Sequence, residues 1–181
     1  MTQARHHCGF TLLRHRRLAS GRVFDVHEET WRAPDGTRFT RQNILHPGAV
    51  AVLAFSAPDR VLLVRQFRAA VRRRLLEIPA GTLEPGETPL ACARRELIEE
   101  VGFAARRWRK LGAVYTAPGF CTEVIHLYRA WDLRPAQAEQ DDDEQIEMVE
   151  MTLREVRAAV RSGRLRDSKS LSALFLAGVL G

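Results

Sequence analysis

Three glutamates, Glu96, Glu99 and Glu100, have the residue type and spacing in this 181-residue chain that could support chemistry most directly. On a helix that turns about 100° per residue, their side chains fall within a sector of about 100°. Carboxylates four positions apart repel each other, and the helix dipole disfavours negative charge in the C-terminal half. We therefore expect positive charge among them, part of it supplied by Arg95.

Clustered oxygen ligands suit a hard divalent cation, with Mg²⁺ the first choice in a cell and Mn²⁺ a working substitute. Protein-bound Mg²⁺ usually keeps several waters and is held by a few carboxylates together with the phosphates of a substrate. The pattern therefore predicts a phosphate-bearing partner. The simpler alternative is a solvated acidic face whose charge is balanced by Arg94 and Arg95.

A helix from Pro89 to Val101 is predicted to carry these glutamates. Thr88 can cap its N-terminus, proline suits the first helical position, and Gly102 provides a C-terminal stop. A separate apolar stripe can face a core, and it consists of Leu90, Leu97 and Val101. The helix is expected to bury one side and to present its carboxylates on another.

Strands are predicted on both sides of this helix. The first three, with the Asp35-Gly36 hairpin signal between the second and third, form an N-terminal antiparallel sheet. Further strands and two more helices make a mixed α/β body. The predicted strands are 10–17, 23–31, 37–44, 50–55, 60–67, 75–78, 112–115, 124–132 and 148–151, and the added helices are 153–162 and one after Asp167-Ser168.

Composition sets the class of protein. A hydrophobic content of 45% and a charged content of 28% are typical of a globular chain. No apolar run approaches the roughly 18 residues that a membrane span needs. The three cysteines, Cys8, Cys92 and Cys121, are odd in number and far apart, which excludes a disulfide framework and a CxxC zinc site. A reducing, cytoplasmic location is expected.

The net charge of +6 raises the question of a nucleic-acid partner. All basic residues except Lys110 and Lys169 are arginines, and they are spread along the chain instead of gathered in one segment. A solvated arginine-rich surface is the preferred interpretation, so a nucleic-acid partner is not expected. The charge suits an anionic substrate without identifying one.

The segment from Gly81 to Phe103 resembles the signature of the nudix hydrolases. That signature is a glycine, five residues, a glutamate, seven residues, and then Arg-Glu-aliphatic-x-Glu-Glu-x-Gly-aliphatic. The matching residues are Gly81, Glu87, Arg95, Glu96, Leu97, Glu99, Glu100 and Gly102, with Phe103 in the final hydrophobic position. The resemblance implies a nudix α/β/α sandwich with mixed sheets that hydrolyses a nucleoside diphosphate linked to another moiety.

The resemblance also implies roles for individual residues. The metal ligands would be three carboxylates and a backbone carbonyl, those of Glu96, Glu99, Glu100 and Ala80. Glu87 and Arg95 would hold the loop and the helix together through charge-assisted hydrogen bonds. Glu99 or Glu144 would take a proton from the attacking water, and the sequence does not choose between them.

Flanking residues resemble the ADP-ribose pyrophosphatase branch of the family. The strings 65–68 (RQFR), 76–81 (LEIPAG) and 143–147 (DEQIE, an acidic loop) match that branch, and Pro118 lies 16 residues beyond Gly102, where a proline marks it. The implied substrate-binding residues are Arg68 at the phosphates or the adenine, Glu84 in the signature loop, Pro118, and Glu123 at a ribose hydroxyl. Thr122 stands where relatives often carry aspartate, which leaves the particular sugar open.

The expected activity is therefore Mg²⁺-dependent hydrolysis of ADP-ribose to AMP and ribose 5-phosphate. One alternative is a nudix hydrolase acting on GDP-mannose or another nucleoside diphosphate derivative. A remote alternative is a non-catalytic nucleotide- or nucleic-acid-binding module, against which the complete set of signature residues argues. The branch exchanges its leading strands between two subunits, which implies a homodimer through an N-terminal β subdomain at 1–45, followed by a nudix hydrolase domain at 46–181.

Overall fold

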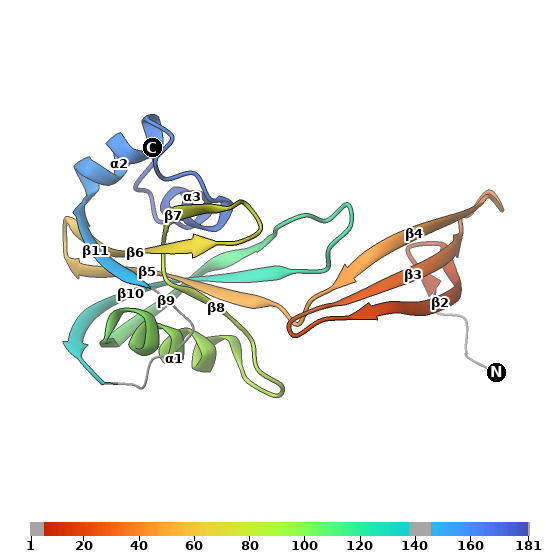
Figure 1. The fold of residues 1–181 in the computed structure, drawn as a ribbon, viewed down its shortest axis with the longest axis horizontal. Coiled ribbons are helices and arrows are strands. Elements are labelled where there is room, and N and C mark those ends of the chain that lie inside the picture. The colour runs from red at the N-terminus through yellow and green to blue at the C-terminus, as the bar shows by residue number, and fades with distance from the viewer. Residues whose placement is uncertain (1–5, 138–145, 181) are drawn as a thin grey trace. The chain divides into compact units, whose positions relative to one another are not determined.

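The structure is a computed structural model that describes residues 6–137 and 146–180 (Figure 1). The chain forms two compact units. The first contains the residues up to Pro47 together with Ala117–Glu123, and the second contains Gly48–Thr116 and the residues from Val124 onward. The whole nudix-like segment belongs to the second unit.

The first unit is an antiparallel sheet in the order β1-β2-β3-β4. Three long strands were predicted, and a two-residue strand precedes them. The strands are β1 (His6–His7), β2 (Phe10–Ser20), β3 (Asp25–Arg32) and β4 (Arg38–Leu45). The turn between β3 and β4 is closed by Asp35, whose carboxylate accepts from the backbone N–H of Thr37 at 2.9 Å, and by Gly36, with a φ of 87°. The Asp-Gly turn therefore forms at the position predicted from the sequence.

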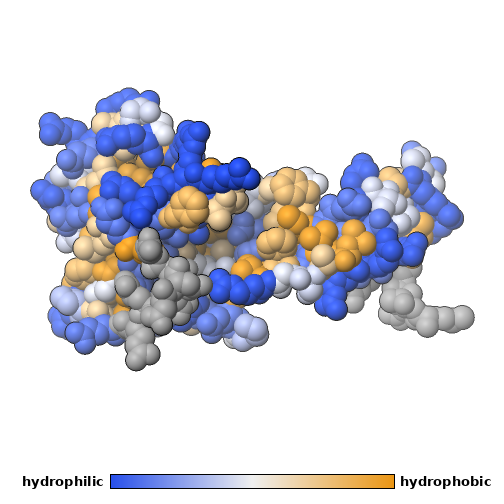
Figure 2. Space-filling model, in the orientation of Figure 1, coloured by the Kyte–Doolittle hydropathy of each residue, from blue (hydrophilic) through white to orange (hydrophobic). Residues whose placement is uncertain are grey.

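This sheet buries no apolar side chain among its described residues. Only Thr11 and His27 are buried between His7 and Pro47. Several large apolar residues are exposed instead, and Figure 2 shows orange, hydrophobic residues on the visible face of this sheet. They are Phe10, Leu13, Leu18, Val23 and Phe24. The described part of the first unit therefore has no hydrophobic core of its own.

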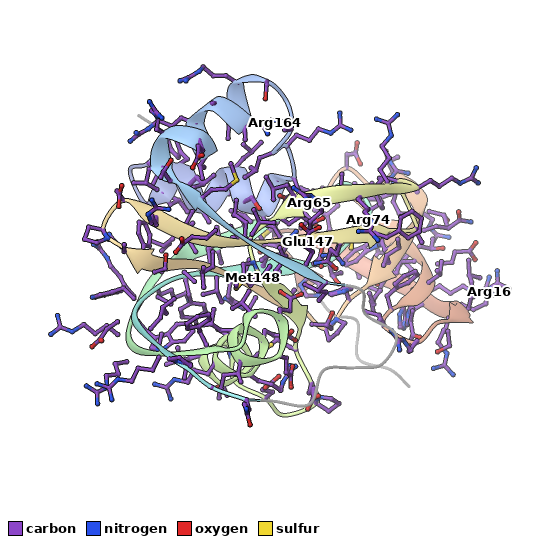
Figure 3. The ribbon with its side chains drawn as sticks, turned by 60° about the vertical axis from the view of Figure 1, so that its left-hand side comes forward. Arg16, Arg65, Arg74, Glu147, Met148 and Arg164 are labelled. Atoms are coloured by element: carbon purple, nitrogen blue, oxygen red, sulfur yellow. The ribbon has the colours of Figure 1, made fainter. Side chains whose placement is uncertain are left out.

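The second unit is built on a mixed sheet in the order β11-β6-β5-β10-β9, with β7 paired to β6 and β8 paired to β5. The parallel pair is β5 with β10, and the other pairs are antiparallel. An exposed ion pair between Arg65 and Glu147, 2.8 Å apart, joins β6 to β11 (Figure 3). The strands are β5 (Ala49–Ala57), β6 (Arg60–Arg68), β7 (Arg73–Glu77), β8 (Ala80–Thr82), β9 (Phe103–Tyr115), β10 (Val124–Pro135) and β11 (Glu147–Thr152).

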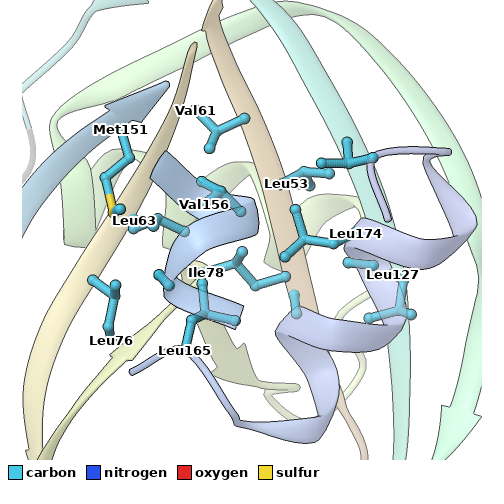
Figure 4. Close-up of a cluster of buried hydrophobic side chains, with 14 of the residues drawn as sticks. Leu53, Val61, Leu63, Leu76, Ile78, Leu127, Met151, Val156, Leu165 and Leu174 are labelled. Carbon is cyan, nitrogen blue, oxygen red and sulfur yellow. The ribbon is translucent and has the colours of Figure 1, made fainter. Parts of the chain in front are cut away.

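Helices cover both faces of this sheet. Successive side chains of a strand point to opposite faces, and β5 is buried on both. Val50 and Val52 pack toward α1 (Pro89–Val101), and Leu53 packs toward α2 (Leu153–Arg161) and α3 (Ser168–Leu176). Figure 4 shows the second of these cores, where Leu53, Val61 and Leu63 meet Val156 and Leu174. The predicted α/β/α sandwich is confirmed.

The strands β5 and β6 separate from each other at one end. They pair near their hairpin, through 54–57 and 60–62, and farther on β6 pairs with β7 while β5 pairs with β8. The linking residues Ile78 and Pro79 lie between the two strands, because the backbone N–H of Val52 donates to the carbonyl of Pro79 at 2.8 Å. This opening in the sheet brings the segment before the signature next to α1.

Helices α1 and α2 form within a residue of their expected bounds, and α3 begins at the expected cap, Asp167, and ends at Leu176. None of the described helices is long and apolar enough to span a membrane. The prediction was wrong about β9, which was given only residues 112–115 and begins at Phe103. The missed part carries Arg106, Arg107, Arg109 and Lys110. Because β9 is an edge strand, these charged side chains remain exposed to water. The alternation between apolar and polar residues that would predict a strand is therefore weak in this part of the sequence.

Candidate functional site

Local sequence signals fix the position of α1. The side chain of Thr88 accepts a hydrogen bond from the backbone N–H of Ala91 at 3.3 Å, and Pro89 occupies the first turn. Gly102 ends the helix with a φ of 72°, the left-handed conformation that glycine adopts without strain. One side of the helix is anchored by buried Ala93 and Leu97. The signature glutamates follow beside this buried stripe, and Glu100 is itself buried.

The absence of a side chain at Gly81 leaves room for the carboxylate of Glu96. A Cβ atom added to Gly81 would lie 1.7 Å from Oε1 of Glu96, which is far inside van der Waals contact. The carboxylate of Glu96 therefore rests directly against the backbone of β8, and its side chain is only 12% exposed. Glycine at this position of the signature is explained by this close approach.

Glu100 is tied to the same strand. It is buried, and its Oε2 accepts a hydrogen bond from the backbone N–H of Ala80 at 2.8 Å. Two glutamates one helical turn apart thus place their carboxylates at adjacent residues of β8, Ala80 and Gly81. Glu99 is the most exposed of the three, with 34% of its side chain accessible. The structure brings together the predicted ligands Glu96 and Glu100 and the backbone of Ala80.

Arg95 lies among the carboxylates. Its Nη1 donates to Oε1 of Glu96 at 2.7 Å and to Oε2 of Glu99 at 2.9 Å. Its Nε and Nη2 donate to the two oxygens of Glu87 at 3.1 and 3.0 Å, and Nη2 also reaches the carbonyl of Thr82 at 3.3 Å. The positive charge expected among the glutamates is therefore present as one guanidinium that joins the helix, the loop and β8.

These contacts perturb the protonation of the participating groups. Hydrogen bonds from Arg95 lower the pKa of Glu87, and the bonds to Glu87 raise the pKa of Arg95. Burial, together with the charges of Glu87 and Glu96, raises the pKa of Cys92 to about 12. Glu87 and Arg95 are thus held as a charged pair, and Cys92 is held as a neutral thiol.

The loop before α1 is closed by the same glutamate. The backbone N–H of Glu84 donates to Oε2 of Glu87 at 3.2 Å, and the backbone N–H of Glu87 donates to the carbonyl of Glu84 at 3.0 Å. The side chain of Glu84 is exposed. The loop therefore keeps a fixed backbone while Glu84 remains accessible to a ligand.

The donor chemistry fits a hard divalent cation. Carboxylate oxygens of Glu96, Glu99 and Glu100 and the backbone at Ala80 offer oxygen ligands alone, and the close approach at Gly81 preserves the space for one of them. In the described part of the chain, no three His, Cys, Asp or Glu side chains stand together as a complete metal site. Arg95 bridges Glu96 and Glu99 in this arrangement.

A second charged group borders this site, and sequence reasoning missed most of it. Arg68 donates to Glu77 through Nε at 3.1 Å and through Nη2 at 2.7 Å. Lys169, from the first turn of α3, donates to both Glu77 and Asp167. A glutamate within the short apolar run of Leu75, Leu76 and Ile78 was the available signal, but its partner Lys169 lies 92 residues farther along the chain.

Three other predicted residues do not belong to the described part of the second unit. Pro118 is exposed in a turn closed by the N–H of Phe120 on the carbonyl of Ala117, at 3.0 Å, and it belongs to the first unit. Glu123 is also in the first unit, where its carboxylate lies 3.6 Å from Nε2 of His46. Glu144 lies outside the described residues. The roles predicted for these three stay predictions.

The site and the fold together define the class of protein. Residues 45–174 match the NUDIX domain family, and the chain superposes on a crystal structure titled as an ADP compounds hydrolase. That superposition has a TM-score of 0.84, covers 97% of this chain and 95% of the other, and has 26% sequence identity. The chain belongs to the nudix family, and its sequence predicted this membership.

The chain is also similar to two pyrophosphatases that act on different nucleoside diphosphate sugars. The chain is 40% identical over 159 residues to an ADP-ribose pyrophosphatase of Bacillus subtilis, which covers 87% of this chain and 86% of the relative. It is 38% identical over 136 residues to a GDP-mannose pyrophosphatase of Citrobacter koseri, covering 70% of this chain and 71% of the relative. Family membership makes the protein a nudix pyrophosphohydrolase that uses a divalent metal ion.

Proposed function

We propose that this protein hydrolyses the diphosphate bond of ADP-ribose, giving AMP and ribose 5-phosphate. The observation that carries the proposal is the gathering of Glu96, Glu99 and Glu100 against β8 and Arg95. The similarity to an ADP-ribose pyrophosphatase over most of both chains supports the choice of substrate.

In the proposed reaction, water attacks one phosphorus and the bridging P–O bond breaks, so that each product keeps one phosphate. Glu96, Glu99 and Glu100, with the carbonyl of Ala80, would hold Mg²⁺, for which Mn²⁺ can substitute. When bound, the ion neutralises the diphosphate and lowers the pKa of a bound water.

The chain's own groups position the reactants. Arg95 and Glu87 fix the helix and the loop, so the glutamates are preorganised before the substrate arrives. Glu99, the most exposed of the signature glutamates, and Glu144 are the two candidates for the general base. The substrate-binding roles remain those proposed for Arg68, Glu84, Pro118 and Glu123.

A substrate panel tests this function. Purified protein is incubated with Mg²⁺ and, separately, with ADP-ribose, GDP-mannose, CoA, a dinucleoside tetraphosphate or 8-oxo-dGTP, and the products are separated by chromatography. We expect AMP and ribose 5-phosphate, with kcat/KM for ADP-ribose at least about tenfold above that for GDP-mannose. The Glu96→Gln variant serves as the control for contaminating hydrolases. Turnover of none of these compounds by the native protein would contradict the proposal.

GDP-mannose is the second candidate substrate, because a GDP-mannose pyrophosphatase shares 38% identity with this chain. The two substrates differ in both base and sugar, whereas the diphosphate between them is the same. The signature residues therefore serve either reaction equally. A kcat/KM that favours GDP-mannose in the panel would select this candidate.

We also propose a homodimer that associates through the N-terminal strands. Among their described residues, the N-terminal strands bury no apolar side chain, and five large apolar residues between Phe10 and Phe24 are exposed, so a second copy could cover them. The cytoplasm is the proposed location, because the cysteines are free and a reducing compartment keeps thiols in that form.

A further inference from the structure

Four charged side chains form a compact group next to the signature helix. Glu77 has only 2% of its side chain exposed and accepts from both Arg68 and Lys169, and Lys169 also donates to Asp167 at 2.9 Å. Two cations and two carboxylates balance each other within the group. We refer to Arg68, Glu77, Asp167 and Lys169 as the Glu77 cluster.

The cluster links three elements to the proposed catalytic residues. Arg68 ends β6, Glu77 ends β7, and Lys169 lies in the first turn of α3. Burial by itself lowers the pKa of Arg68, but the hydrogen bond and charge of Glu77, with a smaller contribution from the charge of Glu100, raise it overall, so the cluster lies within electrostatic range of the signature helix. The next residue of α3, Ser170, is buried and accepts from the backbone N–H of Ile78 at 2.8 Å. The segment that leads into Ala80 and Gly81 is thus held from α3.

Stability alone does not account for such a group. Buried ion pairs lose the hydration of each charge, and apolar side chains of similar volume often stabilise a fold at least as well. What a buried pair does provide is orientation, because two parallel N–H donors on two carboxylate oxygens fix the plane of a guanidinium. Glu77 holds Arg68 in this two-point manner.

The geometry of Arg68 leaves part of its guanidinium for another acceptor. The bonds to Glu77 use Nε and Nη2, and neither uses Nη1. The side chain of Arg68 is 40% exposed although its partner is almost completely buried. A half-exposed guanidinium fixed at its inner edge is suited to a planar or tetrahedral anion at its outer edge.

We propose that Glu77 is a positioning residue for the hydrolysis. Held from α3 by Lys169, it fixes the guanidinium of Arg68 so that Nη1 meets a phosphoryl oxygen of the substrate. Glu77 itself touches neither the substrate nor the reacting water. This inference rests on the proposed function, because it requires a diphosphate substrate at the signature glutamates.

A double-mutant cycle in KM tests the inference. We expect Glu77→Gln to raise KM for ADP-ribose by about tenfold or more, with a smaller change in kcat, because the substrate loses an oriented phosphate contact. In an Arg68→Ala background, the same substitution is expected to leave KM unchanged. An equal rise in both backgrounds, or no rise in the native background, would overturn the positioning role.

Two further variants separate positioning from folding. Lys169→Met removes the ammonium group that donates to Glu77, and it is expected to raise KM as Glu77→Gln does. This rise is also expected to vanish when Arg68 is alanine. This variant answers the question if Glu77→Gln fails to fold, as judged by circular dichroism. Glu150→Gln is the matched control, because Glu150 forms an exposed ion pair with Arg60 at the other end of β6, and its KM should equal that of the native protein.

A binding measurement keeps the outcomes distinct. The affinity of each variant for a nonhydrolysable ADP-ribose analogue, measured by calorimetry, should fall in parallel with the rise in KM. If native protein binds the analogue without turnover, the proposed hydrolysis fails while this affinity comparison still decides the role of Glu77. If native protein neither binds nor cleaves any nucleoside diphosphate sugar, both proposals fail together.

Discussion

Arg95 and Gly81 determine the local geometry of the candidate site in different ways. Arg95 contributes donors to Glu87, Glu96 and Glu99, so one cation offsets the mutual repulsion of several carboxylates. Gly81 contributes the absence of a side chain, which lets the carboxylate of Glu96 approach the backbone. The two residues explain why acidic side chains can crowd one turn of a helix without destabilising it.

Neutralising a signature glutamate should reduce turnover strongly. We expect Glu96→Gln and Glu100→Gln each to lower kcat by about two orders of magnitude or more, which is the scale of losing one electrostatic contact to the transition state. Steady-state rates at saturating Mg²⁺ provide the measurement. Full turnover in both variants would show that these carboxylates have no catalytic role.

A methyl group at Gly81 should act through Glu96. The backbone of Gly81 does not have a positive φ, so alanine is not strained there, but its Cβ would displace the end of a flexible side chain. We expect Gly81→Ala to lower kcat about as far as Glu96→Gln while changing the free energy of unfolding by less than about 1 kcal/mol.

The control for this prediction removes the displaced carboxylate. In a Glu96→Ala background the added methyl group meets no carboxylate, so Gly81→Ala should have no further effect on kcat. Turnover is measured for the two single variants and the double variant, and unfolding is followed in urea. A loss of stability of several kcal/mol in Gly81→Ala would point to backbone damage instead.

At the scale of elements, the second unit is organised around the separation of β5 from β6. The segment between β7 and β8 fills the opening and is held by Val52 of β5 and Ser170 of α3, and Glu100 of α1 accepts from the backbone of Ala80, where β8 begins. The carboxyl end of β7 therefore connects the C-terminal helix to the signature helix. Changes in α3 are expected to affect the site although α3 packs on the other face of the sheet.

The Glu77 cluster should make stability depend on acid pH. Burial by itself raises the pKa of Glu77, but hydrogen bonds from Arg68 and the charge of Lys169 more than offset this, so the pKa lies below its usual 4.5. A lowered folded-state pKa stabilises the protein above about pH 4.5, and this contribution is lost as the pH falls through the folded-state value.

Urea unfolding of native protein and Glu77→Gln from pH 7 to pH 3 measures this contribution. The difference in unfolding free energy between the two proteins should be constant above about pH 5 and should shrink at lower pH, because only the native protein loses the charged form of Glu77. Other carboxylates titrate in both proteins and cancel in the comparison. A difference that stays constant down to pH 3 would contradict the assignment.

At the scale of the whole molecule, the two units differ in how they are stabilised. The second unit has two apolar cores, one on each face of its sheet. The first unit has none among its described residues, and the segment 117–123 joins it through backbone hydrogen bonds at Ile44. A sheet with exposed apolar residues and no core is most simply completed by a second copy of itself.

The proposed dimer makes a direct prediction about mass in solution. We expect size-exclusion chromatography with light scattering to give twice the mass of the chain, and the double variant Leu18→Asp, Phe24→Asp to raise the dissociation constant by at least about tenfold. Both side chains are exposed in the single chain, so the charges should not prevent folding. Phe175→Asp, at an exposed position of α3, is the matched control and should remain dimeric.

The sequence determined the parts of this protein that depend on local chemistry. Helix α1 has the predicted bounds because Thr88, Pro89 and Gly102 act on the backbone next to them. The family could be recognised because its metal-site chemistry requires fixed residue types at fixed spacing. Charged residues on an edge strand gave no comparable signal, and the long β9 was missed for that reason.

Tertiary structure alone decided which distant residues meet. The contact between Glu77 and Lys169, the close approach of Glu96 to Gly81 and the joining of 117–123 to the first unit all arise from how strands and helices pack. Such contacts depend on the energies of many weak interactions summed over the fold, so no short stretch of sequence encodes them. Spacing identified the reacting groups, and packing determined their geometry.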